Sequence, residues 1–77
     1  MKQGLHVDRH GIRRWYEDGR LHRDGAPAIE DPSGWSAWYR RGHLHRDDGP
    51  AVIGPNGYEQ WWVNGLPRPK PSKRPQG

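Results

Sequence analysis

The chain has 77 residues, no cysteine, no phenylalanine and one methionine, and only 30% of its residues are hydrophobic. This composition excludes disulfides, thiolate metal sites and an ordinary aliphatic core, so the five Trp and three Tyr residues must supply most of the packing. The net charge of +4 lies entirely in the last twelve residues, because residues 1–65 hold nine basic and nine acidic side chains. No apolar run is long enough for a signal peptide or a membrane helix, so we expect a cytoplasmic protein with no membrane partner.

Three β-hairpins are predicted in chain order, over residues 5–16, 27–39 and 51–63. Each joins two short apolar or aromatic runs through a loop that ends in glycine, a residue that accepts positive φ. A second tight turn follows each hairpin, at Asp18-Gly19, Arg41-Gly42 and Asn64-Gly65. Eleven Gly and eight Pro residues are spread too evenly to leave room for helices.

The hairpins belong to an internal repeat of 23 residues that runs without a gap. The aligned columns are Gly11, Gly34 and Gly57; Trp15, Trp38 and Trp61; Tyr16, Tyr39 and Trp62; and Gly19, Gly42 and Gly65. The segment Leu-His-Arg-Asp occurs at 21–24 and again at 44–47. We therefore predict an all-β fold, an elongated antiparallel sheet of about six short strands in a single layer or nearly so.

The repeat ends near Leu66, which divides the chain into a repeat domain of residues 1–66 and a tail of residues 67–77. In the tail, four prolines alternate with Arg68, Lys70, Lys73 and Arg74. Alternating proline favours polyproline II or disorder over a strand. We expect a flexible, basic tail.

The Gly-x-x-x-Trp-Tyr-x-x-Gly pattern over residues 5–66 resembles the MORN repeat family, particularly its shorter bacterial variant. The resemblance implies stacked β-hairpins in one elongated sheet that serves as a scaffold or a contact surface for proteins or lipids, and bacterial relatives are sometimes labelled antitoxin components. The block His-Arg-Asp-x-Gly-Pro-Ala departs from the usual Gly-x-Gly return of the motif. This block is similar to short repeat proteins of phages and large viruses, which would place the chain in a host cytoplasm.

Strand alternation predicts two different aromatic faces. Trp15, Trp38 and Trp61 share one face, with Ala28 and Ala51 filling the gaps between rings. The candidate partner-binding residues share the other face: Tyr16, Trp35, Tyr39, Tyr58 and Trp62. One face could instead be core and the other covered by connectors, so the sequence leaves open which rings are exposed.

Two functions could be considered for the His-Arg-Asp block, general-base catalysis and metal binding, and the sequence argues against both. A general base at His22 or His45, held by an Asp, would need a single asymmetric site, but the block is repeated and the chain has no Thr or Cys nucleophile. A metal ion would need a third and a fourth ligand, and equivalent histidines lie about 9.6 Å apart on alternate strands. We expect Arg pairing with carboxylates and Asp capping turns, and we predict no catalysis, cofactor or metal.

We therefore predict a non-enzymatic binding module, whose partner is a protein contacted through the aromatic face. The alternative is an accessory protein that binds RNA or DNA through Arg68, Lys70, Lys73 and Arg74, with exposed rings stacking on bases. Unprotected sheet edges also favour a homo-oligomer formed by edge or face packing.

Overall fold

The computed structural model describes residues 2–69, which form ten short β-strands and one 3-10 turn. The elements are β1 (Gly4–Val7), β2 (Arg13–Glu17), β3 (Arg20–Leu21), β4 (Ile29–Asp31), β5 (Trp35–Ala37), β6 (Tyr39–Arg40), β7 (His43–Leu44), β8 (Val52–Ile53), η1 (Pro55–Gly57), β9 (Glu59–Val63) and β10 (Leu66–Arg68).

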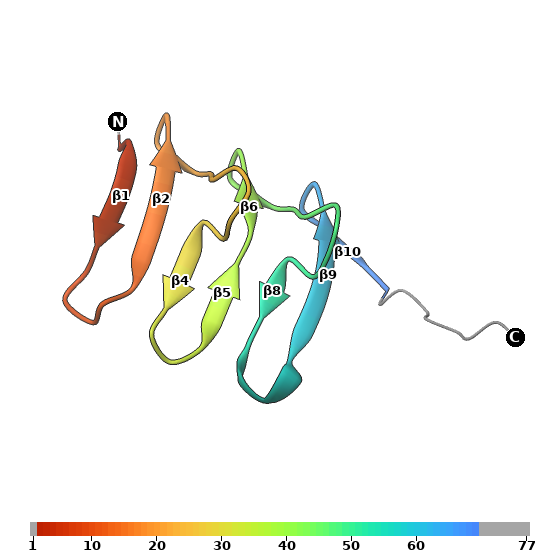
Figure 1. Ribbon diagram of the computed structural model, residues 1–77. Helices are drawn as coiled ribbons and strands as arrows, with labels where there is room; N and C mark the ends of the chain where they lie inside the picture. The colour runs from red at the N-terminus through yellow and green to blue at the C-terminus, as the bar shows by residue number, and fades with distance from the viewer. Residues whose placement is uncertain (1, 70–77) are drawn as a thin grey trace, which may run out of the picture.

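The main sheet has the order β1-β2-β4-β5-β8-β9-β10, and β3 pairs with β2 beside it, while β6 and β7 form a separate two-stranded ladder. All pairings are antiparallel. The molecule measures 50 × 24 × 17 Å, and Figure 1 shows the three long hairpins standing side by side in one open layer. The predicted elongated, all-β sheet of repeated hairpins is confirmed.

A glycine at positive φ ends each of the three hairpin loops, and an aspartate caps the first two, as the turn chemistry predicts. Gly11, Gly34 and Gly57 have φ of 80°, 109° and 79°, in the left-handed region where a Cβ is costly. Asp8 Oδ1 accepts hydrogen bonds from the backbone N–H of His10 (2.8 Å) and Ile12 (3.1 Å). The loops also contact each other, because a Cβ built on Gly11 would lie 3.2 Å from the Pro32 ring.

The second turns are type I′, and they add more strands than the sequence predicted. Asp18, Arg41 and Asn64 have φ near 52°, and each is followed by a glycine at positive φ, the pair that a two-residue hairpin needs. The chain returns from these turns as β3, β7 and β10, and the strand before the second turn is divided into β5 and β6, so there are ten strands rather than about six.

The predicted domain boundary at residue 66 falls two residues short of the end of the sheet. Pro67 pairs with Trp62 and Arg68 with Trp61, so the start of the proposed tail is strand β10. Proline is acceptable there because its missing N–H lies in an edge strand. Residues 70–77 of the tail lie outside the described residues.

Ala28 and Ala51 join one hairpin to the next and are fully buried. Ala28 accepts a hydrogen bond from Trp15 N–H (2.8 Å) and donates to the carbonyl of Ala37 (2.8 Å). Ala51 repeats this arrangement between Trp38 and Gln60, at 2.7 and 2.8 Å. Both alanines thus lie between neighbouring tryptophan strands, and they are the fully buried apolar side chains among residues 2–69.

We expect stability to depend on the carboxylate of Asp8 at low pH. The backbone N–H of Ile12 is the main cause that lowers the pKa of Asp8 below its ordinary value of 3.8, and Arg14 and His10 add to it. Its stabilising contribution is fully present above that ordinary value and is lost as the pH falls through the lower folded pKa. Thermal unfolding measured across acidic pH should therefore show a smaller pH dependence for Asp8→Asn than for the unmodified chain. An unchanged pH profile would contradict this role.

Candidate functional site

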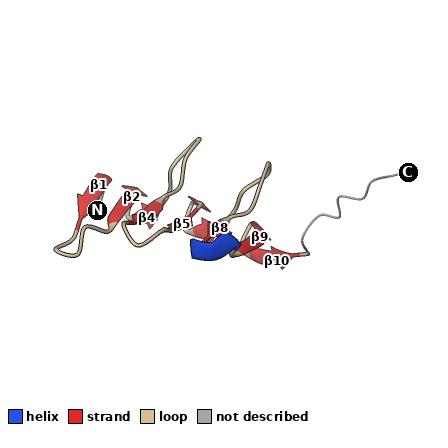
Figure 2. Ribbon diagram, turned by 60° about the horizontal axis from the view of Figure 1, so that its bottom comes forward, coloured by secondary structure: helices blue, strands red, loops and turns tan. Residues whose placement is uncertain are grey.

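The connectors between repeats cover one face of the sheet. Figure 1 shows them passing in front of the strands, and Figure 2 shows two loops standing on the same side of the sheet. Arg23 places its guanidinium 3.7 Å from the centre of the Trp15 ring, and Arg46 lies 3.8 Å from that of Trp38. Each guanidinium also donates to a proline carbonyl, at 3.2 Å for Pro27 and 3.1 Å for Pro50. The first two tryptophans of this column are therefore covered by arginines rather than by a second layer of structure.

The histidine of each block joins its repeat to the next one. His22 Nδ1 accepts a hydrogen bond from the backbone N–H of Arg41 (3.0 Å), and His45 Nδ1 accepts one from Asn64 (2.9 Å). A backbone N–H can only donate, so Nδ1 is the acceptor in both contacts. Nε2 lies 3.2 Å from Asp24 Oδ1 in the first block and 3.2 Å from Asp47 Oδ1 in the second.

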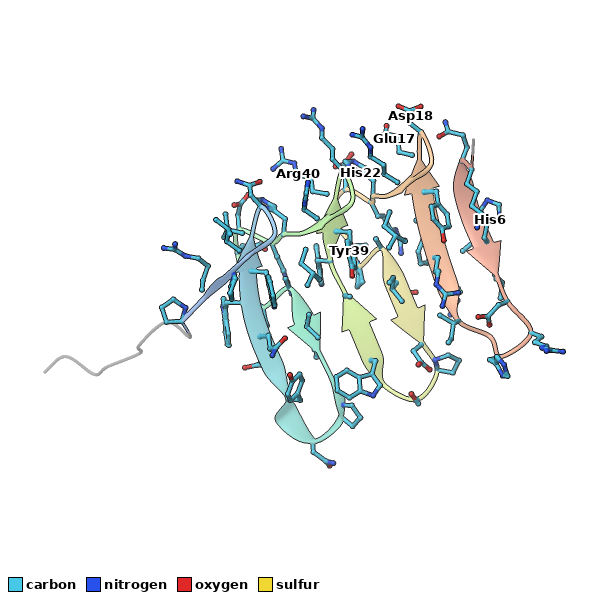
Figure 3. All side chains as sticks on the ribbon, turned by 180° about the vertical axis from the view of Figure 1, so that it is seen from behind. His6, Glu17, Asp18, His22, Tyr39 and Arg40 are labelled. Atoms are coloured by element: carbon cyan, nitrogen blue, oxygen red, sulfur yellow. The ribbon has the colours of Figure 1, made fainter. Side chains whose placement is uncertain are left out.

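Both ring nitrogens of each histidine are thus used in structural contacts. In Figure 3, His22 lies at the turn edge of the sheet beside Glu17, Asp18 and Arg40. Arg23 pairs with Glu30 (3.6 Å) and Arg46 with Asp48 (3.1 Å), which confirms the predicted arginine–carboxylate pairs. The turn cap, however, comes from the histidine, and the aspartate holds that histidine. No group of three potential metal ligands occurs within residues 2–69.

A groove of roughly 390 Å³ lies between the two connectors. Trp38 and Tyr39 line it, together with three arginines and three aspartates from the blocks and from β6. The equal numbers of opposite charges give it no net preference for an anion or a cation. We therefore do not assign a ligand to this groove.

Trp35 and Tyr58, on the opposite face, are the most exposed of the candidate partner-binding rings. Trp35 is 41% exposed and Tyr58 43%. The two rings meet edge to face, with centroids 5.2 Å apart. They come from different hairpins, at the start of β5 and just before β9, so the sheet register brings them together.

Gly54 holds the Trp35 ring in place, a contact that sequence reasoning missed. A Cβ built on Gly54 would lie 2.6 Å from the Trp35 ring, so the indole rests on the glycine backbone. The backbone of Gly54 is extended (φ −127°, ψ −177°), so its conformation does not require glycine and close approach of the ring does. The available signal was the repeat itself, because the equivalent positions are Asp8 and Asp31.

The other three predicted rings are half-buried. Tyr16 contacts its own hairpin, where the His6 ring lies 5.3 Å away and Lys2 Nζ lies 4.8 Å from the ring centre. Trp62 Nε1 donates to Gln60 Oε1 at 3.3 Å. Figure 3 places Tyr39 over the middle of the sheet. An edge-to-face ring contact therefore joins Trp35 and Tyr58, while Tyr16 contacts the His6 ring of its own hairpin.

The basic residues of the nucleic-acid alternative are only partly described. Arg68 is exposed at the end of β10. Lys70, Lys73 and Arg74 lie outside the described residues. Their arrangement therefore adds nothing to that alternative.

Comparison of the chain with protein-family models, with curated proteins and with solved structures gave no match. The resemblance to MORN repeats thus stays a prediction from the residues. Among residues 2–69, no helix has the length and apolar character needed to cross a bilayer.

The histidine cap predicts a specific pair of variants. His45→Ala removes the acceptor of the Asn64 N–H and should lower the free energy of unfolding by about 1 kcal/mol. His45→Asn places an amide oxygen near the position of Nδ1 and should recover part of that loss. Urea unfolding followed by tryptophan fluorescence measures both. Equal destabilisation by the two variants would show that the cap contributes nothing.

The arginine stack predicts a second pair. Arg46→Ala uncovers the Trp38 ring and removes the donor to Pro50, at a cost of about 1–2 kcal/mol in unfolding free energy. Arg46→Lys keeps the charge but lacks the planar guanidinium, so it should fall between the alanine variant and the unmodified chain. If Arg46→Lys were fully stable, charge alone would account for the contact.

Proposed function

We propose that this chain is a non-enzymatic binding module that contacts a protein partner through the open aromatic face of its sheet. The observation that carries the proposal is the Trp35–Tyr58 pair, with both rings over 40% exposed although the fold covers Trp15 and Trp38. Exposed, rigid aromatic rings are typical anchors of protein interfaces. A phage or bacterial accessory or inhibitor protein would fit this role.

The fixed position of the rings supports recognition over simple packing. Gly54 under the indole and Tyr58 at its edge restrict the Trp35 side chain before any partner binds. A side chain that is already ordered loses less conformational entropy on binding. The pair therefore suits a partner with a matching apolar pocket.

Affinity capture with four full-length baits tests the proposal. A specific partner should be retained by the unmodified chain and by Arg13→Ala, since Arg13 alternates with Arg14 and lies on the connector side with Trp15. Trp35→Ala and Tyr58→Ala should each weaken binding by about 2 kcal/mol, or roughly thirtyfold, as expected of interface hot spots. Circular dichroism should show that all four baits are folded. Equal binding by every bait would contradict the proposal.

Gly54→Ala gives a sharper test because it leaves both rings in the chain. The added Cβ must displace the indole, whereas the extended backbone accepts alanine. Binding should fall to a level close to that of Trp35→Ala. Unchanged binding would show that the position of the ring does not matter.

Salt and tail charge separate this proposal from nucleic-acid binding. A protein complex held by aromatic contacts should survive several hundred millimolar salt and the combined change Lys70→Gln, Lys73→Gln and Arg74→Gln in the full chain. Binding through phosphate contacts would fall steeply with both changes. It would also disappear on nuclease treatment. Those results would favour the RNA or DNA alternative.

A further inference from the structure

Strand β1 has one edge with no partner strand among residues 2–69, as the end of the sheet in Figure 1 shows. Asp8 N–H donates to the carbonyl of Ile12 at 3.1 Å, so these two residues form a hydrogen-bonded pair next to the β1–β2 ladder. Hydrogen-bonded pairs recur at every second residue, so the N–H and C=O groups of His6 and Gly4 also point toward β2. The N–H and C=O groups of Leu5 and Val7 therefore point outward.

This edge also lacks the usual protection against strand pairing. All four residues of β1 are exposed, including Leu5 (49%) and Val7 (57%), and none of them is proline or carries an acidic, Lys or Arg side chain. At the other end of the sheet, β10 contains Pro67, which has no N–H to offer. The two ends of the described sheet are thus different.

The outer edge of β1 matches an edge that the chain already uses inside the sheet. In the 23-residue repeat, Leu5 and Val7 occupy the positions of Ala28 and Glu30. Ala28 accepts a hydrogen bond from Trp15 N–H, and Glu30 pairs with Arg13, both on β2. The outward N–H and C=O groups of β1 therefore belong to the same repeat positions that join one hairpin to the next inside the sheet.

We propose that two copies of this chain pair through their β1 strands, antiparallel about a two-fold axis at His6. Leu5 then lies opposite the partner's Val7, and Val7 opposite the partner's Leu5, as hydrogen-bonded pairs. A two-fold contact of this kind closes after two subunits and leaves no free β1 edge for a third. The product is a dimer with one continuous sheet.

Apolar pairing selects this register over its two neighbours. A register centred on Leu5 would place Val7 opposite the partner's Gln3, and one centred on Val7 would place Leu5 opposite the partner's Arg9. Centring on His6 brings all four exposed aliphatic side chains together on one face. Cross-strand apolar pairs of this kind stabilise a sheet by a few tenths to about 1 kcal/mol each.

Cysteine cross-linking tests the register directly, because the chain has no cysteine of its own. In the proposed dimer, His6 and the partner's His6 form a non-hydrogen-bonded pair, whose Cα atoms lie about 4.5 Å apart. That distance suits a disulfide. On mild oxidation His6→Cys should cross-link nearly completely, and Leu5→Cys, offset from its own symmetry mate, should stay largely without the disulfide. Equal cross-linking of the two variants would overturn the register.

Sedimentation equilibrium tests the dimer without cross-linking. The full chain should show twice its monomer mass of 8.9 kDa. Val7→Pro removes only an outward N–H and should abolish the dimer, whereas Val7→Thr keeps that N–H and should retain it. Lysine at both Leu5 and Val7 should also abolish it, and Leu66→Lys, at the opposite end of the sheet, should not.

Three results would overturn the proposal. They are a purely monomeric full chain at millimolar concentration, a dimer that survives both the proline and the double-lysine variant, and a dimer lost only with Leu66→Lys. Circular dichroism of each variant confirms that the sheet is intact. An assembly larger than a dimer would also overturn it, since a two-fold edge contact closes.

Discussion

A single layer of β-sheet exposes both faces to water, and this chain has too few aliphatic residues to cover either one. Ala28 and Ala51 are its fully buried apolar side chains among the described residues. The fold meets this constraint by returning each connector across the sheet, where a guanidinium stacks on a tryptophan ring. The stack hides apolar ring surface while the rest of the connector stays in water. The covered face depends on this return, and so do the contacts of His22 and His45 with the turns at Arg41 and Asn64.

The sequence was most informative where structure is decided locally. Glycine and aspartate act within a few residues, so the hairpin loops and the type I′ turns could be predicted from the 23-residue spacing. The histidine cap could not, because His22 and Arg41 are 19 residues apart and meet only once the connector has crossed the sheet. Strand β10 was missed for a similar reason: proline disfavours a strand, and pairing with Trp62 overrides that local preference.

The candidate site depends on a position where the repeat is broken. The 23-residue periodicity alone does not show which broken position matters. Asp8 and Asp31 accept hydrogen bonds from their own loops. Glycine replaces them at position 54, and the Trp35 ring occupies the space that a side chain would fill. Predicting the five rings as one surface followed from strand alternation, but only Trp35 and Tyr58 are joined by a ring contact. Gly54, the residue that differs from Asp8 and Asp31, therefore points to the Trp35–Tyr58 pair better than the repeated aromatic positions do.

The first and the last described hairpins make different contacts at their outer sides. At the first hairpin, the Gln3 side chain accepts the Asp18 N–H and the Lys2 carbonyl accepts that of Gly19, replacing the contacts of a preceding repeat. At the last hairpin, Arg68 pairs with Trp61, whereas the equivalent Trp15 donates to Ala28 of the next repeat. Head-to-tail stacking of copies would compete with the Arg68 pairing for the N–H of Trp61, because the equivalent Trp15 donates its N–H to Ala28 while its carbonyl accepts the His22 N–H. Symmetric pairing through β1 involves no such competition, so the sequence of the last strand disfavours an open fibre and leaves the first strand free to form a closed dimer.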